Sequence, residues 1–288
     1  MTTVEAEPIT EAGVYDLPEN AYHSDPVPGG SLSSTGARKL LPPSCPALFK
    51  FEKDNPPEST RTFDMGKAAH EMVLGGGPEI VRCDFPDWRT NAAKAAAEEA
   101  RARGAVPLLP EAYQQVQDMA VALLRDPIAS ALFDPASGTP EASLFCRDEE
   151  SGVMLRCRLD WLPKPSGRRL IVADYKTARS AEPEQFVKSA ADHGYHQQAA
   201  WNLDLISALE LGEEPVFVFV VQEKTAPYLV SVVQLDATAL RIGRHLNRRA
   251  IDVYAECVRT DVWPGYANDV ALVPLPAWYE RRYEQEIA

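Results

Sequence analysis

Hydrophobic and polar residues follow a helical period in the first half of the chain. Apolar residues at three-to-four spacing predict an amphipathic helix over 111–133, and an Ala-, Glu- and Arg-rich helix is expected over 89–103. Another helix is expected over 64–74, where Asp64 can cap the first turn and Gly75 begins a run of three glycines that ends it. The first half is therefore predicted to be mainly helical.

The pattern changes to period two after these helices. Residues 141–147 and 153–161 are predicted to be strands joined by a hairpin turn over 148–152. In the second strand, the odd-numbered positions are apolar, whereas Arg156, Arg158 and Asp160 share the opposite face with Met154. The hairpin is therefore expected to bury one face and to present charges on the other.

The remaining elements complete an α/β order. They are a strand over 170–176, a helical region over 183–211, an apolar strand over 216–222, a strand over 228–235 and a final helix capped by Asp236. The order helix, three strands, helix, strand predicts an α/β core with helical additions before it. We expect residues 31–288 to form one domain with a helical insertion at about 85–135.

The acidic residues are unevenly distributed. The 288 residues carry a net charge of −13, and residues 1–30 contain six acidic residues and no Lys or Arg. This Pro-rich stretch has no clear period, so it is expected to be a loosely attached or disordered arm. The acidic balance argues against a general nucleic-acid coat, but it leaves room for a local DNA groove where carboxylates hold metal ions.

The rest of the composition limits the class of protein. No apolar run reaches the roughly 18 residues of a membrane span, and no signal peptide is seen, so we expect no membrane partner. The five cysteines are scattered and form no CxxC pair, which argues against an iron–sulfur cluster, a zinc knuckle or a disulfide framework. A cytoplasmic location fits this cysteine usage best.

The segment Asp174-Tyr175-Lys176 carries the most informative chemistry. In a strand, Asp174 and Lys176 point to the same face, and Asp160 ends the charged face of the preceding strand. If these two strands pair, two carboxylates converge on one divalent cation, and such oxygen ligands suit Mg²⁺. A bound metal would activate water, and Lys176 could orient or deprotonate it. The alternative is an ordinary ion pair at a strand edge.

Five short motifs follow one another along the chain. They are Tyr22-His23 with Leu32-Ser33-Ser34-Thr35, Met65 to His70, Glu141 with Arg158-Leu159-Asp160, Asp174 to Thr177, and Tyr195 to Ala200. In this order they resemble the PD-(D/E)xK nuclease superfamily, and most of all its phage and prophage exodeoxyribonuclease VIII-like (RecE-type) branch, which is related to the RecB nuclease domain. The resemblance implies a restriction-endonuclease-like core of a helix, a three-stranded antiparallel sheet, a helix and a strand.

The resemblance also implies residue roles. The implied metal ligands are His70, Asp160, Asp174 and the Tyr175 carbonyl, and the implied catalytic residues are Lys176, Asp174, Asp160 and Gln198. Glu141 and Tyr195 are implied as supporting residues. The family has Tyr four residues after its motif Gln, whereas Asn202 stands at that spacing here. This departure puts the role of Gln198 in question, but it does not affect the metal site.

The function implied is an exodeoxyribonuclease that uses Mg²⁺ or Mn²⁺. It would act 5′ to 3′ on the ends of linear double-stranded DNA and leave 3′ single strands for phage-type recombination. The implied setting is the bacterial host cytoplasm, with a single-strand annealing protein as partner and a ring-shaped homo-oligomer. Arg156 and Arg158 share a face with Asp160, so DNA-phosphate contact is weighed against an ordinary surface role.

Three alternatives stay open at this stage. The chain could be another nuclease of the same superfamily, or an inactive relative that binds DNA or a recombination protein. It could also be a phage structural protein, which would bind no divalent metal at these residues.

Overall fold

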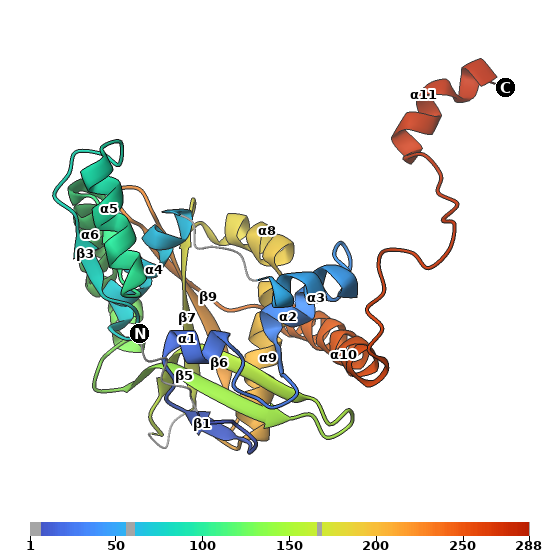
Figure 1. Cartoon of the computed structure of the whole chain (residues 1–288), viewed down its shortest axis with the longest axis horizontal. Coiled ribbons are helices and arrows are strands. Elements are labelled where there is room, and N and C mark those ends of the chain that lie inside the picture. The colour runs from blue at the N-terminus through green and yellow to red at the C-terminus, as the bar shows by residue number, and fades with distance from the viewer. Residues whose placement is uncertain (1–6, 56–60, 166–168, 288) are drawn as a thin grey trace.

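A mixed sheet forms the centre of the computed structural model, which describes residues 7–55, 61–165 and 169–287 (Figure 1). Strands β5 (Gly138–Arg147), β6 (Met154–Pro163) and β7 (Ile171–Ala178) pair antiparallel, and β8 (Val216–Glu223) runs parallel to β7. The strand order is β1-β5-β6-β7-β8-β9, and both outer strands pair antiparallel; they are β1 (Gly13–Tyr15) and β9 (Val230–Val233). The mixed α/β class predicted from the sequence is confirmed.

Two short pairings lie beside this path. Strand β2 (Leu32–Ser33) pairs parallel with β6, and β3 (Ile80–Arg82) pairs parallel with β4 (Val106–Leu108) in a separate ribbon. The β3–β4 ribbon belongs to the mostly helical lobe that precedes the main sheet (Figure 1).

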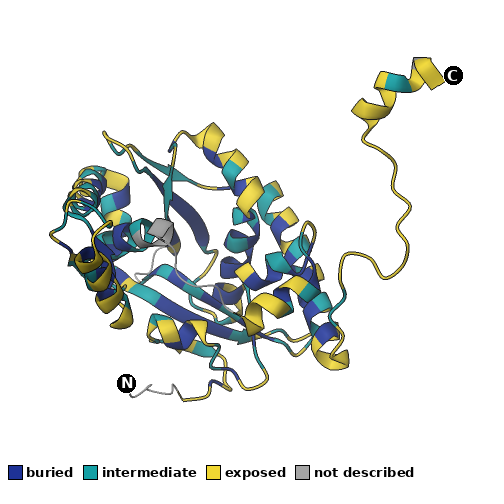
Figure 2. Ribbon diagram, turned by 45° about the horizontal axis from the view of Figure 1, so that its top comes forward, coloured by how far each residue is buried: buried dark blue, intermediate teal, exposed yellow. Residues whose placement is uncertain are grey.

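Helices cover both faces of the sheet. Neighbouring residues of β7 belong to different cores, because side chains alternate across a strand: Val172 packs in one hydrophobic cluster and Ala173 in the other. The first cluster receives α2 (Ser34–Lys39), α3 (Pro46–Asp54), α8 (Pro183–His193), α9 (Tyr195–Ala208) and α10 (Ala237–Thr260). The second receives α4 (Arg61–Leu74), α6 (Pro110–Arg125) and α7 (Pro127–Leu132), and α5 (Asn91–Ala102) packs on β4. Figure 2 shows the buried residues gathered on the sheet and on the inner helix faces.

The predicted helices of the first half are present, with shifted ends. Helix α4 begins at Arg61, three residues before Asp64, and the cap predicted for the Asp64 side chain lies outside the described part of the chain. Gly75 ends α4 with a positive φ of 70°, as expected for a glycine that stops a helix. The predicted helix over 111–133 divides into α6 and α7, because the Asp126 side chain caps a new helix by accepting from the N–H of Ala129 at 2.8 Å.

The segment from residue 7 to residue 30 is packed against the hairpin, in contrast to the expected loose arm. Helix α1 (Glu19–His23) packs on the outer face of β5 and β6, and β1 pairs along the edge of β5. Ile9, Tyr22 and Val27 in this segment are each no more than 8% exposed. The arm prediction missed this because the segment has no period of its own, and the hairpin supplies the surface that buries it.

The C-terminal residues extend away from the body. After α10 the chain runs to α11 (Ala277–Ile287), which lies apart from the sheet in Figure 1. None of the described helices combines the length and the apolar character needed to cross a membrane.

Gly243 tests the close packing of α9 against α10. A Cβ at this position would overlap the carbonyl oxygen of His196, which belongs to the backbone and cannot move away cheaply. We expect Gly243→Ala to lower the free energy of unfolding by about 1–3 kcal/mol, as overpacking does elsewhere. Urea unfolding followed by circular dichroism measures this.

Gly66 in α4 is the matched control. Among the described residues, no atom outside the backbone of α4 lies within 4 Å of a Cβ there, so Gly66→Ala should leave the stability unchanged or raise it by about 0.5–1 kcal/mol. Equal destabilisation by both substitutions would contradict the packing assigned to Gly243.

Candidate active site

Strand β7 places an acidic side chain, Asp174, and a basic side chain, Lys176, at the centre of the sheet. Asp174 is 1% exposed and lies on the same face as Lys176, as the period of two predicts. One carboxylate oxygen, Oδ2, forms an ion pair with the Lys176 ammonium, and the other, Oδ1, accepts a 2.6 Å hydrogen bond from Gln198 Nε2. The Asp174 side chain is therefore held between its own strand and helix α9.

Asp160 on β6 joins two further elements. Its Oδ2 accepts a 2.7 Å hydrogen bond from the backbone N–H of Tyr175, so the carboxylate takes part in the contact between β6 and β7. The same oxygen lies 2.9 Å from Nε2 of His70 on α4. The two strands pair as the sequence analysis required, and Asp160 and Asp174 both belong to this buried cluster.

His70 lies between two carboxylates. Its Nδ1 is 3.0 Å from Oε1 of Glu141, opposite the contact with Asp160. Glu141 adopts a φ of 56°, an uncommon conformation for a residue with a side chain, and such outliers concentrate at functional sites. The other Glu141 oxygen forms an ion pair with the Arg158 guanidinium.

The buried charges shift one another's protonation. Burial lowers the pKa of His70, but Asp160 and Glu141 outweigh it and raise that pKa to about 10. Burial and the Asp160 charge raise the pKa of Asp174 to about 6, against the opposing effect of Lys176. The repulsion between the two Asp carboxylates means that additional positive charge is stabilised between them.

The donor set fits a divalent cation in its chemistry. Carboxylate oxygens and an imidazole nitrogen are ligands for Mg²⁺ or Mn²⁺, and Asp174 Oδ2 is a buried carboxylate oxygen paired with the Lys176 ammonium. Within the described ranges, no group of three or more His, Cys, Asp and Glu residues stands ready to hold a metal ion. His70 is engaged by Asp160 and Glu141, and Asp174 by Lys176, so metal binding requires these ion pairs to open.

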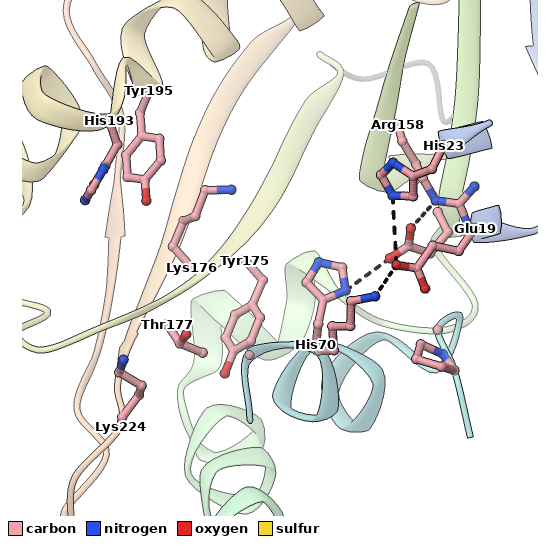
Figure 3. A pocket seen from close by; sticks show the side chains of 15 residues that line it. Glu19, His23, His70, Arg158, Tyr175, Lys176, Thr177, His193, Tyr195 and Lys224 are labelled. Carbon is pink, nitrogen blue, oxygen red and sulfur yellow. Dashed lines mark hydrogen bonds and ion pairs between the residues drawn. The ribbon is translucent and has the colours of Figure 1, made fainter. Parts of the chain in front are cut away.

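A cavity of about 830 Å³ opens onto these groups (Figure 3). Its wall includes His70, Glu141 and Lys176 from the buried cluster. Further lining residues come from helices α1, α4, α8 and α9, from strands β6 and β7, and from the segments that follow α4 and β8; they are Glu19, His23, Gly66, Lys67, Gly77, Pro78, Arg158, Tyr175, Thr177, His193, Tyr195 and Lys224. A ligand in the cavity can therefore reach His70, Glu141 and Lys176, which are in direct contact with Asp160 and Asp174.

Helix α9 contributes both residues that its motif indicated. Gln198 contacts Asp174 directly, and the Lys176 ammonium lies 5.3 Å from the centre of the Tyr195 ring, within cation–π range. Asn202, at the position where the resembled family has Tyr, is 2% exposed. The hydrogen bond between Gln198 and Asp174 is present although residue 202 departs from the pattern of the resembled family.

The two arginines on the hairpin are engaged inside the protein. Arg158 pairs with Glu141 and donates to Leu17 O at 2.7 Å, while Arg156 pairs with Asp25 at 2.7 Å. Both side chains are 12% exposed. This geometry differs from both readings weighed from the sequence, phosphate contact and an ordinary surface role, because each guanidinium is buried and holds the N-terminal segment against the hairpin.

Comparison with known proteins gives a family and a fold. The model of a family described as a PDDEXK-like domain of unknown function (DUF3799) matches residues 33–275, so the chain belongs to that family. A crystal structure from Eubacterium rectale, described as a "putative exonuclease", superposes with a TM-score of 0.63 at 14% identity, covering 91% of this chain and 97% of that one. At this identity, the likeness shows the fold alone.

Two further comparisons add nothing to this. The structure of the protein SSO0001 aligns with a TM-score of 0.30 at 16% identity, over 72% of this chain and 88% of that one, and it supports no argument. No curated protein matches the chain. The family match over residues 33–275 supports the PD-(D/E)xK superfamily, and the RecE-type branch stays a prediction.

Several cavity residues were not found from the sequence. Lys67 and His23 lie inside motifs quoted for the resemblance, yet no role was inferred for them. Glu19 was counted only as part of an acidic arm. Lys224 directly follows the apolar strand β8, and ligands often bind at the carboxyl ends of parallel strands, so the pairing of β7 with β8 is the missing signal.

Arg158 and Glu141 test the buried ion pair. Arg158→Met should lower the free energy of unfolding by about 3 kcal/mol, because the buried Glu141 carboxylate and the Leu17 carbonyl lose their partner. The double variant Arg158→Met/Glu141→Gln should lose at least about 1 kcal/mol less unfolding free energy than the sum of the losses of the two single variants, as expected for coupled residues. Urea unfolding of the four proteins completes the cycle.

The exposed pair of Arg244 and Asp204, at 2.8 Å, provides the comparison. Arg244→Met should cost less than about 1 kcal/mol. Strict additivity of Arg158→Met and Glu141→Gln would show that this pair does not support the hairpin as described.

Proposed function

We propose that this chain is a divalent-metal-dependent exodeoxyribonuclease that hydrolyses phosphodiester bonds at the ends of linear double-stranded DNA. The observation that carries the proposal is the meeting of His70, Asp160, Asp174 and Lys176, from one helix and two strands, beside a cavity that His70 and Lys176 line. Membership of the PDDEXK-like family supports the same reaction class.

The proposed metal ligands are His70 Nε2, the carboxylates of Asp160 and Asp174, and the Tyr175 carbonyl. A bound Mg²⁺ or Mn²⁺ would supply Lewis-acid stabilisation of the phosphoryl oxygens and a more acidic water molecule. Two hydrogen bonds orient these carboxylates: Gln198 Nε2 donates to Asp174, and the Tyr175 N–H donates to Asp160.

Lys176 is proposed to position the attacking water and to balance the negative charge of the substrate. Its ammonium is held beside Asp174 and over the Tyr195 ring, so it is fixed from two sides at the cavity wall. An ordered ammonium aimed at the reacting phosphate stabilises the charge that develops in the transition state without reorganisation.

The substrate preference and the partners rest on the sequence resemblance. It supports 5′ to 3′ polarity, production of 3′ single-stranded ends for phage-type recombination, a single-strand annealing protein as partner and a homo-oligomeric ring. The second candidate is an inactive DNA-binding relative; it is disfavoured because every residue of the proposed chemistry is present and within contact of another.

Cleavage of labelled DNA tests the reaction. Linear duplex DNA should be degraded from its ends with Mg²⁺ and not with EDTA, while closed circular duplex should be spared. Asp174→Ala and Lys176→Ala should each abolish degradation, because they remove a proposed ligand and the fixed ammonium. Labels at the 5′ or the 3′ end give the polarity.

Asp118→Ala and Lys94→Ala on exposed helical surfaces are the matched controls and should retain activity. A folded wild-type protein that degrades neither DNA would contradict the nuclease proposal. Metal-dependent degradation by a folded Asp174→Ala protein would contradict the assigned site.

Gln198 and His70 should differ in the size of their effects. His70→Ala removes a proposed ligand, so activity should be lost and the heat of Mn²⁺ binding in calorimetry should disappear. Gln198→Ala removes only a hydrogen bond to a ligand, so activity should fall about 10- to 100-fold with metal binding retained at weaker affinity. Equal effects of the two substitutions on metal binding would contradict these roles.

A further inference from the structure

The charges around the cavity are divided between two walls. On one wall, the carboxylates of Glu19 and Glu141 line the cavity, and the cations beside them are already paired. Lys67 Nζ is 2.7 Å from Glu19, and Arg158 is bound to Glu141. Figure 3 shows Glu19, His23 and Arg158 gathered on this side of the cavity. This wall offers little free positive charge to a polyanion.

Among the lining residues that the structure describes, those of the opposite wall include no carboxylate. This wall is lined by Thr177, His193, Tyr195 and Lys224, which lie on the far side of Lys176 from Glu19 in Figure 3. Across the described ranges, no acidic group lies within 4.0 Å of Lys224 Nζ, whereas Lys67, Arg158 and Lys176 at the same cavity each have such a partner. Lys224 is therefore the uncompensated lysine of the cavity within the described chain.

The backbone of Lys224 is fixed relative to the buried cluster. Its N–H donates to Ala178 O at 3.1 Å, and its carbonyl accepts from Gln115 Nε2 at 2.5 Å. Lys176 pairs with Val221 in the parallel register of β7 and β8, so Lys224 lies three residues further along. At the usual strand rise this is about 10 Å.

We propose that the phosphate backbone of the DNA strand runs along this wall, with Lys224 binding a phosphate that flanks the scissile one. The Thr177 hydroxyl, between Lys176 and Lys224 along the strand direction, is placed to donate to the same stretch of backbone. A strand along the opposite wall would instead face Glu19 and Glu141. This inference rests on the proposed function and adds the direction in which the substrate leaves the reacting centre.

Fluorescence anisotropy with a fluorescein-labelled linear duplex in EDTA measures binding without turnover, so it reports on Lys224 separately from cleavage. Lys224→Gln should raise Kd about tenfold and reduce the slope of log K against log salt by about 1, because one phosphate contact is lost. Lys224→Arg should restore most of the affinity, since the charge is kept. Lys94→Gln on α5 removes an exposed lysine outside the cavity and should leave Kd and the slope unchanged.

Cleavage kinetics with Mg²⁺ give the second readout. Lys224→Gln should raise KM by a similar factor with kcat within about twofold, because the contact is to a flanking phosphate. Equal Kd and salt slope for Lys224→Gln and Lys94→Gln would overturn the inference while leaving the proposed reaction intact. A larger effect of Lys67→Gln than of Lys224→Gln would place the strand on the other wall. Failure of the wild-type protein to cleave would count against the proposed function alone.

Discussion

The carboxylate of Asp160 is the contact on which the arrangement of the site depends. One oxygen of this group accepts the Tyr175 N–H and lies against His70, so a single side chain joins β6, β7 and α4. Within the described part of the chain, the backbone register of β6 with β7 consists of one pair, Trp161 opposite Ala173. The carboxylate therefore supplies part of the cohesion that backbone pairing supplies elsewhere in the sheet.

A carboxylate in this position requires compensation, because burying an unpaired charge is costly. The chain meets the requirement with alternating charges from separate elements: Arg158, Glu141, His70 and Asp160 are in contact in that order. Asp174 is compensated by Lys176 and Gln198. These pairs hold the site together, and the same groups are the donors that a metal ion needs. The ion pairs that stabilise the fold and the coordination of a metal ion therefore require the same side chains, so the two compete.

The sequence predicted the parts of the site that depend on local pattern. Period two correctly placed Asp160 with the charged face of its strand, and Asp174 with Lys176. The likeness to a known motif brought His70 and Gln198 to the same place, where the structure puts both in contact with the Asp carboxylates. The parts that failed depend on distant partners. Arg158 looked available for phosphate because nothing local shows that Glu141 turns toward it at a positive φ. The arm over residues 7–30 looked loose because its burial depends on the outer face of the hairpin.

The acidic composition is compatible with a DNA substrate for a local reason. Many acidic groups near the cavity are already paired, and the wall that carries Lys224 has no carboxylate. Net charge governs the long-range field, whereas the position of a few uncompensated cations decides where a phosphate can bind.

Anomalous diffraction from a crystal soaked in Mn²⁺ tests the central claim most directly, because it locates a metal without depending on turnover. The structure predicts an anomalous peak in contact with the carboxylates of Asp160 and Asp174 and with His70, together with opening of the His70–Asp160 ion pair. Absence of a peak there at a Mn²⁺ concentration that occupies other sites, with that ion pair intact, would contradict a metal-dependent active site.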